Sequence, residues 1–221
     1  MDLKTGSGVQ EDKFTGSYFQ WIRQELQGWD TFPWALFAFG VGFELAALLL
    51  GTINAVAIIT FVGTFFGMWC TVAMGAGGYD KDGNRVVSHA INGLLGAISV
   101  LAYVYVNYKA GHWFSIVDQL IFFSLIDVEL MATWRTWGRG QNAGVKALKL
   151  KGWIATIVAI LIGWGVLYYL GIILKDSNPV WDSLVLAIGA TASWLCFRRY
   201  STTYTLWLLE DVVNIILWFT A

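Results

Sequence analysis

Three long stretches without Asp, Glu, Lys or Arg constrain this chain more than any other feature. They cover residues 45–79, 86–108 and 152–174. A helix that crosses the hydrocarbon core of a bilayer needs about 20 mostly apolar residues, and each stretch is long enough to supply one. Only 13% of the 221 residues are charged, which is too little charge to cover the surface of a water-soluble domain. The sequence therefore predicts an all-α integral membrane protein.

Apolar runs and the turn at Gly51–Asn54 divide the chain into seven predicted transmembrane helices. We place them at residues 33–50, 53–74, 90–108, 113–137, 153–174, 180–197 and 202–221. The polar segment 1–30 comes first and contains no stretch that resembles a cleavable signal. Within it, residues 18–27 are either an interfacial helix, with Tyr18, Trp21, Ile22 and Leu26 on one face, or a mobile tail.

The distribution of Lys and Arg predicts the orientation. Most of these residues lie in segment 1–30, in the connections 75–89 and 138–151, and in the turn at Arg198 and Arg199. Lys109 and Lys175 alone fall on the opposite side of the predicted helices. Because cationic residues concentrate on the cytoplasmic side, we expect a cytoplasmic N-terminus, an extracytoplasmic C-terminus and an odd number of spans.

Connection lengths suggest two three-helix units, residues 31–108 and 152–221, joined by a central linker helix at 112–137. Segment 1–30 stays on the cytoplasmic side. The linker inverts the chain, so the second unit repeats the orientation of the first as a parallel repeat. Trp69 and Trp194 close the second helix of each unit, as related positions in a repeat would.

Polar side chains inside the predicted spans are the candidates for a substrate site, because an unpaired polar group in a bilayer is costly. The seventh span carries Glu210, Asp211 and Asn214, and helical spacing places Asn214 on the same side as Trp207 and both acids. The alternative role for any of these residues is an interhelical hydrogen bond.

The third and fourth spans carry further candidates. Asn92 and Tyr103 share one stripe of the third span with Gly96, which permits close approach of a ligand or a helix. The fourth span is polar on two opposite faces, one with Asp127 and Trp134 and the other with Asp118 and Glu129. A helix that is polar on both sides is predicted to be buried on both sides, which makes Asp127 and Gln119 candidate site residues. For Glu44 we expect a contact to a neighbouring helix.

Several classes of protein are disfavoured by what the spans do not contain. Arg135, at the inner end of span four, is the one Lys or Arg predicted within a span, so no buried partner for a phosphate is visible. The last span has no lysine that could hold retinal. No metal-binding motif occurs, Cys70 and Cys196 lie in apolar runs, and no charge pattern points to nucleic acid. We therefore expect neither an enzyme nor a protein with a cofactor or metal.

Four short motifs carry a resemblance to a known family. They are Leu26–Trp29, the segment from Asn92 to Tyr105, the W-x-x-W within Met131–Trp137, and Trp207–Asn214. In this order they resemble the PnuC family of vitamin transporters. The resemblance implies a bacterial inner-membrane carrier with a SWEET-like arrangement of three, one and three helices. It also implies facilitated diffusion of a dephosphorylated vitamin, usually nicotinamide riboside, which phosphorylation traps in the cell, and a homotrimer.

The riboside agrees with the residues, because a cationic pyridinium suits aromatic faces and carboxylates and a carboxamide suits Asn or Gln. Thiamine, also a cationic aromatic compound, remains an alternative, as do a proton-coupled carrier that uses Asp127, Glu210 and Asp211 and a non-transporting scaffold. The predicted substrate-binding residues are Trp69, Asn92, Tyr103, Gln119, Asp127, Trp134, Trp137, Trp194, Trp207, Glu210, Asp211 and Asn214.

Overall fold

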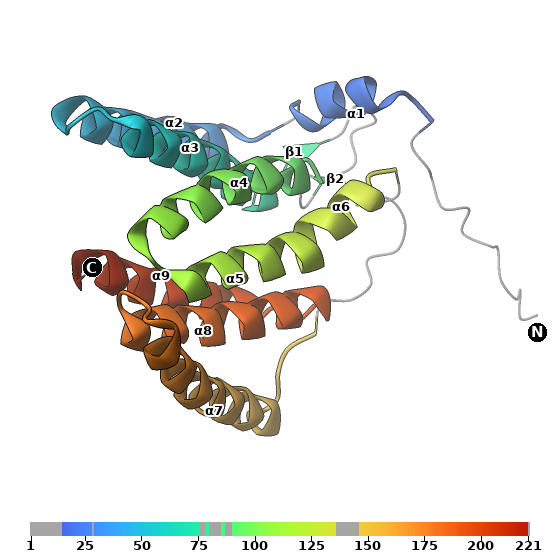
Figure 1. Ribbon diagram of the computed structural model, residues 1–221. Helices are drawn as coiled ribbons and strands as arrows, with labels where there is room; N and C mark the ends of the chain where they lie inside the picture. The colour runs from blue at the N-terminus through green and yellow to red at the C-terminus, as the bar shows by residue number, and fades with distance from the viewer. Residues whose placement is uncertain are drawn as a thin grey trace, which may run out of the picture.

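The computed structural model describes residues 15–27, 29–75, 78–79, 85–86, 90–135 and 146–220, and these are almost entirely helical (Figure 1). The helices are α1 (Tyr18–Glu25), α2 (Thr31–Leu50), α3 (Ala55–Gly75), α4 (Asn92–Ala110), α5 (Trp113–Phe122), η1 (Phe123–Asp127), α6 (Val128–Ala132), α7 (Leu150–Leu174), α8 (Pro179–Phe197) and α9 (Thr203–Thr220). An antiparallel pair of two-residue strands, β1 (Gly78–Tyr79) and β2 (Arg85–Val86), lies between α3 and α4. The helical prediction is confirmed.

Four of the described helices, α2, α3, α7 and α8, are long and apolar enough to cross a membrane, judged by length and composition. α2 packs mainly on α3, and α7 packs mainly on α8. Both outer helices leave large apolar side chains exposed, such as Phe39 and Leu161. Exposing these side chains to water would cost about 25 cal/mol per Å². Contact with lipid tails removes that cost, so the packing agrees with a membrane-embedded chain.

A central helix, formed without a break by α5, η1 and α6, passes between α4 and α8 (Figure 1). Its two polar faces therefore both meet protein, as the sequence predicted. η1 is a stretch of π-helix, and such stretches often occur at functional sites. The helix ends at Ala132, earlier than the predicted limit of 137, and Trp137 lies outside the described residues.

Two glycines let the central helix pack closely against its neighbours. On α4, a Cβ at Gly96 would lie 2.5 Å from Asp127 Oδ1. On α8, a Cβ at Gly189 would overlap the Asp118 carboxyl group. Each carboxyl group of the central helix thus occupies the space above a glycine. Asp118 and Asp127 are nine residues apart, or two and a half helical turns, which places them on opposite faces.

The start of α5 is fixed by two acids from the other half of the chain. Asp182 on α8 accepts hydrogen bonds from the backbone N–H of Phe114, at 2.7 Å, and of Ser115, at 2.9 Å, and from the Ser115 hydroxyl. Asp176 accepts a hydrogen bond from the Trp113 N–H at 3.0 Å. These contacts satisfy N–H groups that the first turn of a helix leaves without partners, and they tie the central helix to α8.

The short helix α1 lies against the protein. Ser17 and Gln20 form a capping box at its start, and Trp21 is only 2% exposed in a core that includes Cys70 and Leu130. The interfacial face predicted from the sequence, which includes Tyr18, therefore packs on α3, α4 and α6 side chains. Of the two alternatives for this segment, the helix is the one observed.

Candidate functional site

Three carboxyl groups gather near the middle of α8 and α9, and we call them the carboxyl cluster: Asp118, Glu210 and Asp211. Asp118 is almost fully buried, and its carboxyl group lies within hydrogen-bonding reach of Glu210. Asp118 Oδ1 has no hydrogen-bond partner among the described residues. The Glu210 side chain is half-buried, and the Asp211 side chain is exposed on the surface of α9. The cluster therefore combines enclosed and accessible acceptors contributed by α5 and α9.

Tyr103 connects this cluster to the first helices of the chain. Its hydroxyl group shares a hydrogen bond of 3.0 Å with the Thr64 hydroxyl on α3. It also lies close enough to Glu44 on α2 and to Asp211 on α9 to interact with their charges. Gly67, a turn from Thr64, lets α3 approach α4. Tyr103 is thus close to acids from opposite ends of the sequence.

A second polar region lies on the α4 side of the central helix. Asp127 is fully buried, and neither of its carboxyl oxygens has a hydrogen-bond partner within the described part of the chain. Asn92 Oδ1 on α4 and Trp69 Nε1 on α3 are also buried without such a partner. Because buried polar groups are normally hydrogen-bonded, these atoms are candidates for contact with a ligand.

Aromatic rings border both regions. Trp207 on α9 packs against both hydrophobic cores, and its ring centroid lies 5.8 Å from that of Phe122 and 5.7 Å from that of Tyr204. Trp69 lies among α2 and α3 rings, stacked on Phe66 with centroids 6.4 Å apart. Flat cationic ligands are attracted to such ring faces.

The structure brings together some of the predicted site residues. Glu210, Asp211, Asn214 and Trp207 follow one another on α9, with Tyr103 near Asp211, while Gln119 is half-buried next to Asp118.

Other predicted residues lie elsewhere. Trp134 packs at the end of the central helix against Trp21, with ring centroids 5.5 Å apart. Trp194, on α8, is 52% exposed and packs on Phe197 and Arg198. Its surroundings differ from those of Trp69, its predicted repeat counterpart.

The sequence did not single out Asp118 or Asp182 as central residues. Asp118 was visible only as part of a polar stripe, and Asp182 caps a helix 67 residues away, which no local pattern shows. His112, next to the predicted start of the fourth span, was not singled out either. It is fully buried, with its ring 4.9 Å from that of Trp218. Burial lowers the pKa of His112, and the negative charge of Asp176 opposes that shift.

The charges available at the site limit its chemistry. In the described helices α2 to α9, Lys and Arg occur only in end turns, at Lys109 and Lys151. The site therefore offers carboxyl, amide and aromatic groups but no cation from these helices. Among the described residues, no three His, Cys, Asp or Glu side chains are arranged so that they could hold a metal ion. This combination suits a ligand that carries positive charge on an aromatic ring.

Comparisons with known proteins agree with this description. Residues 86–221, more than half of the chain, match the family described as "Nicotinamide mononucleotide transporter". A relative from Neisseria mucosa, the "Nicotinamide riboside transporter PnuC", is 25% identical over 213 residues, which cover 91% of this chain and 73% of the relative. The fold is similar to that of the "Crystal structure of the Vitamin B3 transporter PnuC", with a TM-score of 0.68 and 23% identity over 92% of this chain and 83% of the other. The chain belongs to the nicotinamide mononucleotide transporter family.

Proposed function

We propose that this protein is a bacterial inner-membrane carrier for nicotinamide riboside. One observation carries the proposal: the carboxyl cluster and the Trp207 ring lie together on helices that contribute no mid-span cation. A pyridinium ring would gain from the aromatic face and the negative charge, and its carboxamide would gain from Gln119 and Asn214. The relative from Neisseria mucosa is named for the same compound.

The same chemistry disfavours a phosphorylated substrate, although the family's name refers to a mononucleotide. Proteins bind phosphate groups with Arg, Lys or the N-termini of helices. The described mid-span residues provide acids where a phosphate would require cations. We therefore place the dephosphorylated form in the site. Thiamine has the same kind of positive charge and is the competing substrate.

The proposed arrangement has three, one and three membrane-spanning helices. Residues 31–108 form the first unit, 112–137 the linker and 152–221 the second unit, which repeats the first in parallel and follows the cytoplasmic segment 1–30. The position of the central helix between α4 and α8 supports it. So does the alternation of consecutive long helices, which leaves α1 and the C-terminal end of α9 on opposite sides (Figure 1).

This arrangement predicts a cytoplasmic N-terminus and an extracytoplasmic C-terminus. A reporter fused after Ala221 should be active outside the cytoplasm, and a reporter inserted within 138–151 should be active inside it. If both reporters fall on one side of the membrane, the number of spans is not seven and the parallel repeat is lost with it.

The proposed contacts to substrate divide between two regions. The ring and carboxamide would lie among residues of the central helix and α9, and the ribose would lie toward the α4 face of the central helix. The proposed set is Trp69, Asn92, Tyr103, Gln119, Asp127, Trp134, Trp137, Trp194, Trp207, Glu210, Asp211 and Asn214. Trp134 and Trp137 would act at the inner end of the path.

We propose that transport is facilitated diffusion, that phosphorylation in the cytoplasm traps the substrate, and that the protein is a homotrimer. Proton coupling is the second candidate, because Asp127, Glu210 and Asp211 carry carboxyl groups without a described Lys or Arg nearby in the helices. A pH gradient across proteoliposomes separates the two mechanisms. Proton coupling predicts uptake against a riboside gradient, and facilitated diffusion predicts none.

The test of the substrate is calorimetric binding of nicotinamide riboside, its mononucleotide and thiamine to the purified protein. Riboside should bind most tightly. Glu210→Gln should weaken riboside binding about tenfold, because a charge-assisted contact is lost. Asp30→Asn is the matched control, since Asp30 lies at the start of α2, outside the carboxyl cluster, and its side chain makes no capping hydrogen bond there. Equal or tighter binding of the mononucleotide would refute the proposal.

A further inference from the structure

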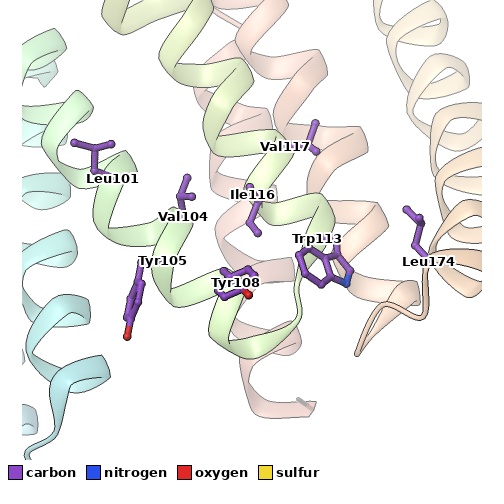
Figure 2. A pocket seen from close by; sticks show the side chains of 8 residues that line it. All are labelled: Leu101, Val104, Tyr105, Tyr108, Trp113, Ile116, Val117 and Leu174. Carbon is purple, nitrogen blue, oxygen red and sulfur yellow. The ribbon is translucent and has the colours of Figure 1, made fainter.

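An apolar groove lies at the end of the molecule where α4 turns into α5. It has a volume of about 890 Å³ and is lined by α4, α5 and the last residue of α7 (Figure 2). Leu101 and Val104 line it on α4, and Ile116 lines it on α5. These side chains lie outside the two polar regions of the candidate site. Leu101 and Val117 are exposed, so the groove opens on the outer surface of the helices.

Aromatic rings occupy the end of the groove nearest the helix termini. Tyr105 and Tyr108 come from the last turns of α4, and Trp113 is the first residue of α5 (Figure 2). The rings of Tyr108 and Trp113 meet edge to face, with centroids 5.9 Å apart. Tyr and Trp concentrate at the level of lipid headgroups. The groove thus runs from the headgroup level into the hydrocarbon.

Two exposed lysines border this aromatic end. Lys109 Nζ lies 5.7 Å from the centre of the Tyr105 ring. Lys175 follows Leu174, the α7 residue that lines the groove. Asp176 and Asp182, the described acids at this end, are buried and accept backbone hydrogen bonds. The exposed charge described here is therefore positive.

We propose that the groove binds an anionic phospholipid, with an acyl chain between α4 and α5 and the phosphate between Lys109 and Lys175. Charge complementarity identifies the occupant, because the phosphate of an anionic phospholipid can form charge-assisted hydrogen bonds with Lys side chains. A second copy of this chain that covered the groove with an apolar surface would leave both lysines without a negatively charged partner. Lysines are rare on the extracytoplasmic side of membrane proteins, and both of those predicted there border this groove.

Native mass spectrometry of the purified protein with added phosphatidylglycerol or phosphatidylcholine tests the proposal. Phosphatidylglycerol should bind more tightly, and the Lys109→Gln, Lys175→Gln double variant should weaken it about tenfold to thirtyfold. The matched control is Lys149→Gln, Lys151→Gln, which removes two charges at the opposite end of α7. Riboside binding should be unchanged in both double variants.

Val104→Trp, which fills the groove, should reduce phosphatidylglycerol binding without changing the mass of the oligomer. Equal binding of the two lipids would overturn the proposal. So would full retention of phosphatidylglycerol by the lysine double variant. A change in oligomer mass on Val104→Trp, with lipid binding intact, would assign the groove to a contact between copies of the chain.

Discussion

Replacing Gly96 by alanine should push the central helix away from α4. The added Cβ would lie 2.5 Å from Asp127 Oδ1 and 2.9 Å from Asp127 Cγ, whereas ordinary van der Waals contact begins near 3.4 Å. Asp127 must therefore retreat by roughly 1 Å. It is fully buried, and Gly93 already holds its backbone against α4, because a Cβ there would lie 3.0 Å from the Asp127 carbonyl oxygen.

The size of the effect follows from two opposing terms. Overpacking typically costs about 1–3 kcal/mol, and replacing glycine by alanine within a helix returns about 1 kcal/mol. The net loss is therefore at most about 2 kcal/mol, which corresponds to a fall in Tm of up to roughly 8 °C for a chain of this length. Riboside affinity should also fall, because Asp127 is displaced. Gly42→Ala and Gly165→Ala are matched controls, since a Cβ at either position meets no atom within 4 Å.

The assay is thermal unfolding of the purified protein, combined with calorimetry of riboside binding. Asp127→Ala removes the clashing carboxyl group, so the double variant Gly96→Ala, Asp127→Ala should be more stable than the sum of the single effects predicts. If Gly96→Ala melts like the two control variants, or if the two substitutions add without coupling, the close packing of Asp127 on Gly96 is not what holds these helices together.

Three further predictions concern single residues. Because burial lowers the pKa of His112, the unfolded chain takes up this proton at a higher pH than the folded protein, so stability should fall as pH drops below about 6.5. His112→Phe should reduce that fall, and a Tm profile from pH 7.5 to 5 that matches the wild type would contradict it. Asn214→Leu should weaken riboside binding about tenfold to a hundredfold, because a polar group of the bound riboside would lose its hydrogen-bond partner at a cost of roughly 1–3 kcal/mol. Normal binding by calorimetry together with a lower Tm would show that Asn214 has a structural role instead. Asp182→Ala leaves two buried N–H groups and a hydroxyl without their acceptor, so it should cost about 3 kcal/mol or more, and an unchanged Tm would refute the capping role.

The fold was predictable where it depends on local pattern. Runs of apolar residues located the long helices, and the nine-residue spacing of Asp118 and Asp127 showed a helix buried on both sides. The π-helical stretch Phe123–Asp127 was not predictable, because it depends on how the central helix fits between α4 and α8. The end of that helix is predicted too late, because Trp134 and Trp137 extend the run of residues typical of a membrane span beyond the last helical residue, Ala132.

Part of the candidate site was predictable for the same reason. The acids on α9 could be recognised as polar residues within an apolar run. In the structure, Glu210 lies against another carboxyl group. That partner, Asp118, could be recognised only once α5 and α9 were placed together. Trp194 illustrates the limit of repeat matching: its sequence position parallels Trp69, but its side chain points out of the protein core.

Uptake of labelled nicotinamide riboside into proteoliposomes tests the central proposal most directly. Riboside inside empty vesicles should rise to the external concentration and stop there, with or without a pH gradient, and vesicles that enclose a riboside kinase and ATP should continue to accumulate label. Glu210→Gln should slow this uptake, and Asp30→Asn should not. Uptake of the mononucleotide in place of the riboside, or entry no faster than into protein-free vesicles, would contradict the account.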